Sequence, residues 1–389
     1  MRRFLMAAGV ALLTAGLAGC GGSSGTGGSS GSGGDYKVGV VMQLSGTGSV
    51  YADSARAGIK AGTADVNRRK AAGRTIVTDL ADAGGDAQTT SVTCSRLVQQ
   101  EHVKALVVFI PGPQLTACDA VAKRGNVPVL SLSSGAGNIC APNLVSLGLV
   151  PNQQSLPVIS HLLGQGKKSW YFFGANYSTP KATIAAAKPY LTAHGGTVAG
   201  EAYEPLGTSD FSQDIAKIVA AHPDVAFLNT IGNDDVALQK QWAADPRTKG
   251  ITRVDILLGE GPGKALGSAA DGIWSSNAYF SSVPGAGNDA FKAAVKATGF
   301  TGLPDINTYI SYMQLETLAT AVKQRGTSGP SVIKALAGAS VPGPVGTLAV
   351  RDAFSYQPVY LAQATKDGGF VIRQRAEAIA PQLACAARS

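Results

Sequence analysis

The sequence predicts an α/β protein with two Rossmann-like lobes, each built on a parallel sheet with helices on both faces. Short apolar segments alternate with amphipathic segments from residue 36 onward, and the alternation restarts after residues 147–154. About 355 residues follow the first 34, which is more than one hydrophobic core usually serves. Right-handed crossovers bring the carboxyl ends of parallel strands to one edge, so we expect a binding site there.

The first 19 residues have the layout of a signal peptide. Arg2 and Arg3 precede an uncharged apolar segment that is too short to span a bilayer. The Leu-Ala-Gly-Cys at 17–20 resembles a bacterial lipobox, which implies lipidation of Cys20, and the alternative is an ordinary signal peptide with an incidental cysteine. Residues 20–35 follow as a flexible Gly/Ser tether. We therefore expect an exported protein that is anchored by lipid to the outer face of the cell membrane, or on its periplasmic side.

The first block alternates predicted strands with predicted helices. Strands are expected at 36–44, 75–83, 105–110 and 127–133, and helices at 54–69, 87–101 and 114–125. The strands are rich in Val, Ile and Leu, which is typical of a sheet buried on both faces.

The second block repeats this order. Strands are expected at 169–175, 197–205, 224–232 and 254–261, and helices at 179–196, 212–223 and 236–245. A long helix is expected at 305–326. Antiparallel strands are expected within 346–372, with Asp367-Gly368 as a turn signal.

Four cysteines remain besides Cys20, and an even number in an exported protein predicts two disulfides. Cys94 and Cys118 lie on consecutive predicted helices beside the same sheet, which favours this pair. Cys140 with Cys385 then follows by elimination. Neither cysteines nor histidines have metal-site spacing, so we expect no metal and no cofactor.

Charge and motifs disfavour two classes of function. The net charge of +8 falls to +6 once Arg2 and Arg3 leave, and the remaining charges form no basic stripe, so we expect no nucleic-acid partner. Residues 259–266 lack the spacing and the Ser or Thr of a phosphate-binding loop. Local motifs for a catalytic nucleophile with its base are also missing, so we expect a binding protein and not an enzyme.

The predicted strand-end loops carry complementary polar groups. Those of the first block offer hydroxyls, a carboxamide and glycine N–H groups suited to an acceptor oxygen: Gly112, Gln114, Ser133, Ser134 and Gly135. Those of the second block are rich in acceptors suited to an ammonium or amide N–H: Tyr177, Asn233, Asp234 and Glu260. An alternative is that Asp234 or Asp235 caps a helix at 236–243, and we favour the cap for Asp235.

The order and spacing of several segments resemble the extracellular ligand-binding receptors of branched-chain amino acid, amide and urea ABC importers. These segments include "VGVVMQLSGTGSVYADSARAGIKAG", "VPVLSLSSGAGN", "EPLGTSDFSQDIAKIVAAHPDVAFL", "ADGIWSSNAYF" and "FSYQPVYLAQATKDGGFVI". The resemblance implies the type I periplasmic-binding (Venus flytrap) fold, with three hinge crossings near 148–153, 277–282 and 343–348. The lobes would then comprise 36–150 plus 280–345, and 151–279 plus 346–389.

The resemblance also assigns roles to residues. In the amino-acid binders of this family, the loop corresponding to Ser133, Ser134 and Gly135 holds the ligand carboxylate. Tyr177 matches an aromatic residue that covers the ligand, and Glu260 matches the acid that pairs with the α-amino group.

Two further positions complete the resemblance. Tyr51 matches a wall residue of the first lobe, whereas Pro111-Gly112-Pro113 stand where those binders have a hydroxyl residue. Either the Gln114 amide substitutes for that hydroxyl, or the ligand is not an α-amino acid.

The resemblance implies a monomeric, lipid-anchored receptor that captures a small amino acid or amide-like solute by hinge closure. Such a receptor delivers its solute to an ABC permease in the membrane. The alternative is a sensor of the same fold that reports to a receptor or regulator.

Overall fold

The computed structural model describes residues 34–132 and 141–382. The predicted signal peptide, Cys20 and nearly all of the tether lie outside the described residues. So do Ser133, Ser134, Gly135, Cys140 and Cys385.

The first sheet has eight strands in the order β11-β12-β13-β5-β4-β3-β1-β2. Its parallel part comprises β1 (Tyr36–Met42), β2 (Ile76–Asp82), β3 (Ala105–Phe109), β4 (Val129–Ser131) and β5 (Leu144–Ser146). An antiparallel extension comprises β11 (Ser340–Gly343), β12 (Gly346–Arg351) and β13 (Phe354–Tyr356), and β13 pairs in parallel with β5.

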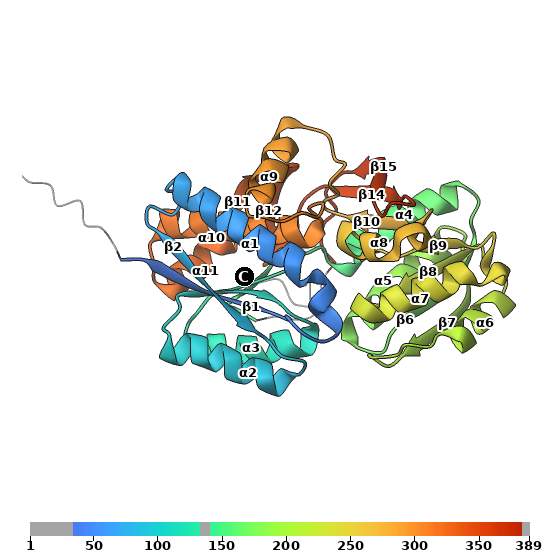
Figure 1. The fold of residues 1–389 in the computed structure, drawn as a ribbon, viewed down its shortest axis with the longest axis horizontal. Helices are drawn as coiled ribbons and strands as arrows, with labels where there is room; N and C mark the ends of the chain where they lie inside the picture. Colours follow the sequence, from blue (N-terminus) through green and yellow to red (C-terminus); the bar gives the residue numbers. More distant parts are fainter. Residues whose placement is uncertain (1–33, 133–140, 383–389) are drawn as a thin grey trace, which may run out of the picture. The chain divides into compact units, whose positions relative to one another are not determined.

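Helices cover both faces of this sheet (Figure 1). One face carries α1 (Ala52–Arg68), α9 (Ala286–Lys296), α10 (Ile306–Arg325) and α11 (Gly329–Leu336). The other face carries α2 (Ala87–Ser95), its π-helical continuation η2 (Arg96–Gln100) and α3 (Gly112–Arg124). Successive residues of β1 point to opposite faces, so Val40 packs in one hydrophobic cluster and Val41 in the other.

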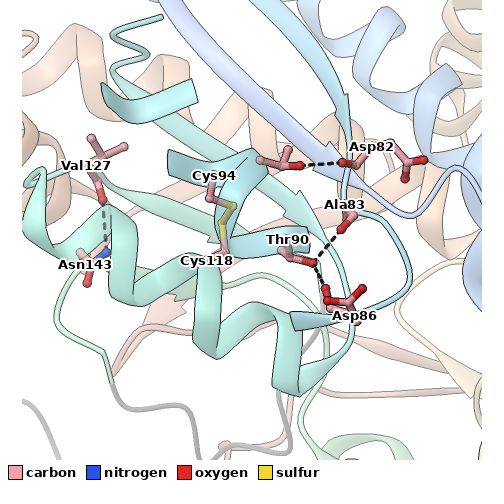
Figure 2. The surroundings of a disulfide bond; sticks show 9 residues. Asp82, Ala83, Asp86, Thr90, Cys94, Cys118, Val127 and Asn143 are labelled. Carbon is pink, nitrogen blue, oxygen red and sulfur yellow. Dashed lines mark hydrogen bonds between the residues drawn. A yellow bond between two sulfur atoms is a disulfide. The ribbon is translucent and has the colours of Figure 1, made fainter. Parts of the chain in front are cut away.

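A disulfide joins Cys94 of α2 to Cys118 of α3, the pair that the sequence favours (Figure 2). Both cysteines are fully buried, and their Cα atoms are 5.5 Å apart. The two helices are neighbours on the same face of the sheet, which brings the cysteines within bonding reach.

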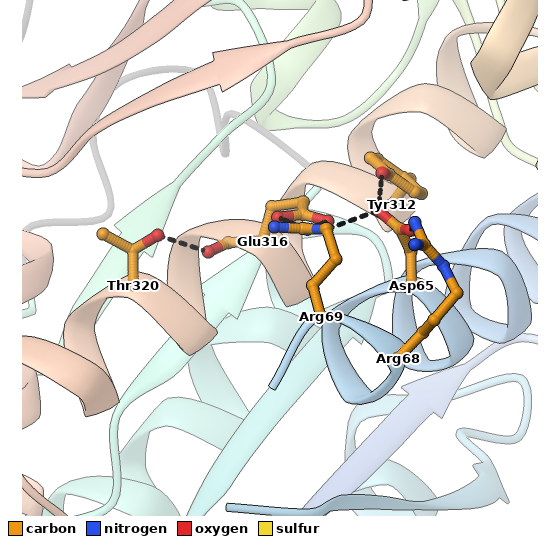
Figure 3. Close-up of polar contacts among 6 residues, drawn as sticks. All are labelled: Asp65, Arg68, Arg69, Tyr312, Glu316 and Thr320. Carbon is orange, nitrogen blue, oxygen red and sulfur yellow. Dashed lines mark hydrogen bonds and ion pairs between the residues drawn. The ribbon is translucent and has the colours of Figure 1, made fainter. Parts of the chain in front are cut away.

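Helices α1 and α10 are held together by a polar network as well as by apolar packing (Figure 3). Arg69, at the end of α1, donates to a Glu316 carboxylate oxygen at 2.6 Å. The hydroxyl of Tyr312 donates to Asp65 at 2.7 Å. The more exposed Arg68 pairs with the same aspartate.

The second sheet has seven strands in the order β15-β14-β10-β9-β8-β6-β7. The strands are β6 (Ser169–Ala175), β7 (Thr197–Glu204), β8 (Val225–Asn229), β9 (Thr252–Val254), β10 (Trp274–Asn277), β14 (Val359–Ala364) and β15 (Phe370–Ala376). The last two are antiparallel and joined by a turn at Asp367-Gly368, which confirms that turn prediction.

Helices also pack on both faces of the second sheet. They are α4 (Pro151–Gly164), α5 (Ser178–Ala193), α6 (Ser212–Ala220), α7 (Gly232–Ala244) and the short α8 (Glu260–Leu266). Phe172 packs with α4 and α5, whereas its neighbour Phe173 packs with α6 and α7. The predicted α/β fold with two sheets is therefore confirmed.

The chain passes between the sheets at three places. The first two passages, between β5 and α4 and between β10 and α9, fall at the predicted crossings near 148–153 and 277–282. The third lies between β13 and β14, about ten residues after the predicted 343–348. The cause is a tight turn in which Gly343 pairs with Gly346, so residues 346–356 return to the first sheet and not to the second.

Candidate functional site

A cavity of about 160 Å³ lies between the two sheets, at the carboxyl ends of their parallel strands. The first sheet contributes residues that follow β1, β3 and β4, and the second contributes residues at the ends of β6, β8 and β10. The first crossing and the start of α10 complete the wall. This is the edge at which open α/β sheets bind ligands.

The described lining of the cavity is mainly apolar and carries no charged side chain. Its apolar and aromatic members are Tyr51, Phe109, Ile110, Pro111, Leu132, Leu149, Tyr177, Ile231, Leu257, Ile306 and Ile310. Its polar side chains are the amides and hydroxyls of Gln43, Gln154, Thr179, Thr183, Asn229, Asn277 and Asn307. Such a wall suits a compact solute with an apolar body and a few hydrogen-bonding groups.

Tyr51 ends the short 3-10 helix η1 (Thr47–Tyr51) and lines the cavity from the first sheet's side. Its hydroxyl accepts a hydrogen bond of 2.8 Å from the backbone N–H of Gly232, the first residue of α7. Its ring lies 5.8 Å from that of Phe109. Burial raises the pKa of the Tyr51 hydroxyl, and nearby Asp235 adds to this effect. Tyr51 thus joins the two parts of the wall in a closed arrangement.

Gly112 and Tyr177, two other residues that the sequence singled out, also line the cavity. Gly112 is the first residue of α3, and a Cβ atom added there would lie 3.4 Å from the hydroxyl oxygen of Ser178. Tyr177 immediately precedes α5, and burial raises the pKa of its hydroxyl.

Gln114 is buried, but it is not among the described residues that line the cavity. Its carboxamide oxygen accepts from Gln43 at 3.1 Å, and its nitrogen donates to the carbonyl of Gly84 at 3.1 Å. Gln43 is the residue of this pair that reaches the cavity wall. Its place directly after the apolar strand 36–42 is the sequence signal that could have identified it.

Glu260 lies outside the described lining as well. It is the first residue of α8 and is buried, with one carboxylate oxygen accepting from the backbone N–H of Ser281. The other oxygen has no partner among the described residues. Burial raises the pKa of this carboxyl to about 8, and the nearby charge of Asp305 contributes in the same direction. The prediction of a strand at 254–261 is wrong, because β9 spans only Thr252–Val254 and Glu260 begins a helix six residues after the strand ends.

The acidic start of α7 differs from the sequence prediction. The helix begins at Gly232 and not at 236, with Ile231 at its N-cap, so the prediction that Asp235 caps it is wrong. Asn233 is exposed and Asp234 accepts from the backbone N–H of Gly207, so neither lines the cavity within the described part. Asp234 and Asp235 lie in the first turn of α7, where negative charge is favourable.

Two buried carboxyls meet behind this helix start. Asp235 accepts from the Thr230 hydroxyl at 2.7 Å and contacts Asp255, which follows β9. Burial, with Asp235 beside it, raises the pKa of Asp255 well above its ordinary value. The adjacent Arg253 is half-buried, and desolvation lowers its pKa to about 10. A proton shared by the two acids, with this cation nearby, keeps the region close to neutral.

Within residues 34–132 and 141–382, no group of three or more His, Cys, Asp or Glu side chains is arranged to hold a metal ion. None of the helices in these ranges is long and apolar enough to cross a membrane.

Comparisons with known proteins agree with this geometry. A family model described as periplasmic binding protein matches residues 35–369. The Leu/Ile/Val-binding protein homolog 6 of Brucella melitensis is 26% identical over 346 residues, covering 85% of this chain and 87% of that protein.

Solved structures share the fold at lower sequence identity. A solute-binding protein of an ABC transporter from R. palustris, in complex with benzoate, aligns with a TM-score of 0.81 and 22% identity, covering 90% of this chain and 99% of its own. An amino acid ABC transporter substrate-binding protein from Pseudomonas fluorescens aligns with a TM-score of 0.79 and 18% identity, covering 90% and 97%.

Proposed function

The chain belongs to the periplasmic binding protein family, and on this basis we propose that it is the lipid-anchored solute receptor of an ABC importer. Like its relatives, it is a solute-binding protein and not an enzyme. The solute enters between the two sheets, closure buries it, and the closed surface is presented to a membrane permease. A solute drives closure only by binding the closed state more tightly than the open state.

One observation carries this proposal: the cavity has walls from both sheets, and the Tyr51 hydroxyl spans them by bonding to the N–H of Gly232. A cavity with two walls is emptied by opening and sealed by closing. Capture and release of a small molecule require both states.

Of the two solute classes that the sequence indicates, the described lining favours the amide-like one over a zwitterionic amino acid. Five carboxamides line the cavity, and its other described members are apolar, hydroxyl-bearing or glycine. Amide groups pair well with amides in both donor and acceptor roles. The benzoate complex from R. palustris and the Leu/Ile/Val-binding relative support the same size range.

A ligand screen of residues 35–389 tests this proposal. Thermal shift against benzamide, benzoate, leucine and glucose should give a hit with benzamide or benzoate, because a ligand at a hundred times its Kd adds about 2.7 kcal/mol of stability. Glucose is the negative control. A panel without a hit for benzamide or benzoate, including one in which leucine alone binds, would contradict the proposed solute class.

Proton release separates the amide from the amino acid. With a pKa of about 8, the Glu260 carboxyl is mostly protonated at pH 7. If it pairs with a ligand ammonium it must ionise, so binding releases nearly one proton, whereas a neutral amide releases none. Calorimetry in two buffers of different ionisation enthalpy measures this number, and Glu260→Gln should abolish any release.

The anchor and the transport role have their own tests. Cys20→Ala should move the protein from the membrane fraction to the soluble fraction, and retention in the membrane would contradict the lipid anchor. Deleting the gene should stop uptake of the bound solute if the protein serves import. Unchanged uptake with an altered cellular response to the solute would instead identify a sensor.

A further inference from the structure

Asn229 lines the cavity at the carboxyl end of β8, a strand in the interior of the second sheet. Only 1% of its surface is exposed. Its backbone is fixed by pairing with Gly174 of β6, so this side chain starts from a rigid strand and not from a loop. Asn229 is not among the residues that the sequence singles out.

The side-chain nitrogen of Asn229 has no hydrogen-bond partner within the described part of the protein. The other four carboxamides of the cavity wall differ in this respect, because each donates to the protein itself. Gln43 donates to Gln114, Gln154 to Asn277, Asn277 to the carbonyl of Leu258, and Asn307 to Asp305.

A buried amide N–H without a partner costs about 1–3 kcal/mol, so a native protein rarely keeps one without a use. Asn229 borders the cavity, but its side-chain nitrogen is closed to water in this structure, so a partner that enters the cavity reaches this donor once the amide group turns toward it. Because the described lining is neutral, an acceptor oxygen of a bound solute can meet this donor without displacing an ion pair.

We propose that Asn229 is the specificity-determining donor of this cavity and selects solutes that carry a carbonyl or carboxylate oxygen. This inference rests on the proposed solute-binding function and deepens it. The apolar residues of the wall contact the body of the solute, and the Asn229 amide donates a hydrogen bond to the solute oxygen at the end nearest the second sheet. Solutes of the same shape without that oxygen leave the donor unpaired and bind more weakly.

The test compares two leucine substitutions on the same cavity wall. Asn229→Leu removes a donor that the protein does not satisfy, so the unliganded variant should unfold at the same denaturant concentration as the native protein, or a higher one. The matched control, Asn277→Leu, breaks hydrogen bonds to Leu258 and Gln154, so it should unfold at a lower concentration.

Affinity is then measured with benzamide, which carries the carbonyl oxygen, and with toluene, which has the same ring without it. Asn229→Leu should weaken benzamide binding at least tenfold and leave toluene binding unchanged or stronger. Retained stability with weakened benzamide binding supports the proposal. Unfolding as early as that of Asn277→Leu, or benzamide affinity equal to the native value, would overturn it.

The outcome is separable from that of the proposed function. If the native protein binds none of the tested compounds, the proposed solute class fails. The unfolding comparison of Asn229→Leu with Asn277→Leu needs no ligand, and it still decides whether the Asn229 amide serves the fold.

Discussion

Replacing Glu260 with glutamine should make the protein more stable at alkaline pH, although the substitution removes a buried native residue. The carboxyl of Glu260 is 3% exposed, and burial raises its pKa from 4.5 to about 8. The native state therefore keeps this proton over a pH range in which the unfolded chain has lost it. The free energy of unfolding falls with rising pH wherever the native state binds more protons than the unfolded state.

The size of this loss in stability follows from the interval between the pKa of Glu260 in the unfolded chain and its pKa in the native state. Below pH 4.5 both states are protonated and the full stability is present, and above about pH 8 both are ionised and the loss is complete. The interval of about 3.5 pH units, at about 1.4 kcal/mol per unit, sets an upper limit of roughly 5 kcal/mol. Glutamine does not ionise, and its amide oxygen can still accept from the N–H of Ser281.

Urea unfolding at pH 5 and pH 8.5 measures this difference. The free energies of unfolding of the native protein and of Glu260→Gln should be similar at pH 5. At pH 8.5 the variant should be more stable by at least about 2 kcal/mol. The exposed Glu377→Gln serves as the control and should follow the native protein at both pH values. Parallel pH dependence of Glu260→Gln and the native protein would refute the reasoning.

Two further substitutions test closure and the packing of the first sheet's helices. Tyr51→Phe keeps the ring but removes the acceptor of the Gly232 N–H, so it should weaken solute binding roughly five- to tenfold in calorimetry. Unchanged affinity would show that this bond does not favour the closed state. Arg69→Leu leaves the buried Glu316 without its cation, and since Arg69 is 41% exposed we expect a loss of about 2 kcal/mol in urea unfolding. Arg68→Leu, at an arginine that is 71% exposed, should change stability by less than about 0.5 kcal/mol, and equal losses in both variants would contradict the role of burial.

Most of the fold could be predicted because its parallel strands are short apolar segments between amphipathic helices. This periodicity is local, and local patterns are what a sequence displays. The assignment of β12 and β13 to the first sheet could not be predicted in this way. It depends on whether the chain after Gly343 turns back or crosses over, and both courses use strands of the same composition.

In the candidate site, the residues that could be predicted are those at the ends of regular elements. Tyr51, Gly112 and Tyr177 lie at such ends, and the structure places all three on the cavity wall. The sequence favours Gln114 as an amide at a strand end, but α3 begins at Gly112 and turns Gln114 toward Gly84. Gln43 takes its place on the wall. Whether Gln43 or Gln114 reaches the cavity depends on where α3 starts. A sequence pattern gives the start of a helix only to within several residues.

The acidic residues show why composition alone does not define a binding site. From the sequence, Asp234 and Glu260 are candidate partners for a ligand ammonium, whereas Asp235 is favoured as a helix cap. In the structure Asp235, Glu260 and the nearby Asp255 are buried outside the described lining of the cavity, and desolvation raises the pKa of each carboxyl. A raised pKa lowers the negative charge that an acid carries, and Arg253 lies beside the Asp235–Asp255 pair, so the described wall stays close to neutral. The charge that a solute meets is therefore set by burial, and burial is a property of the assembled fold.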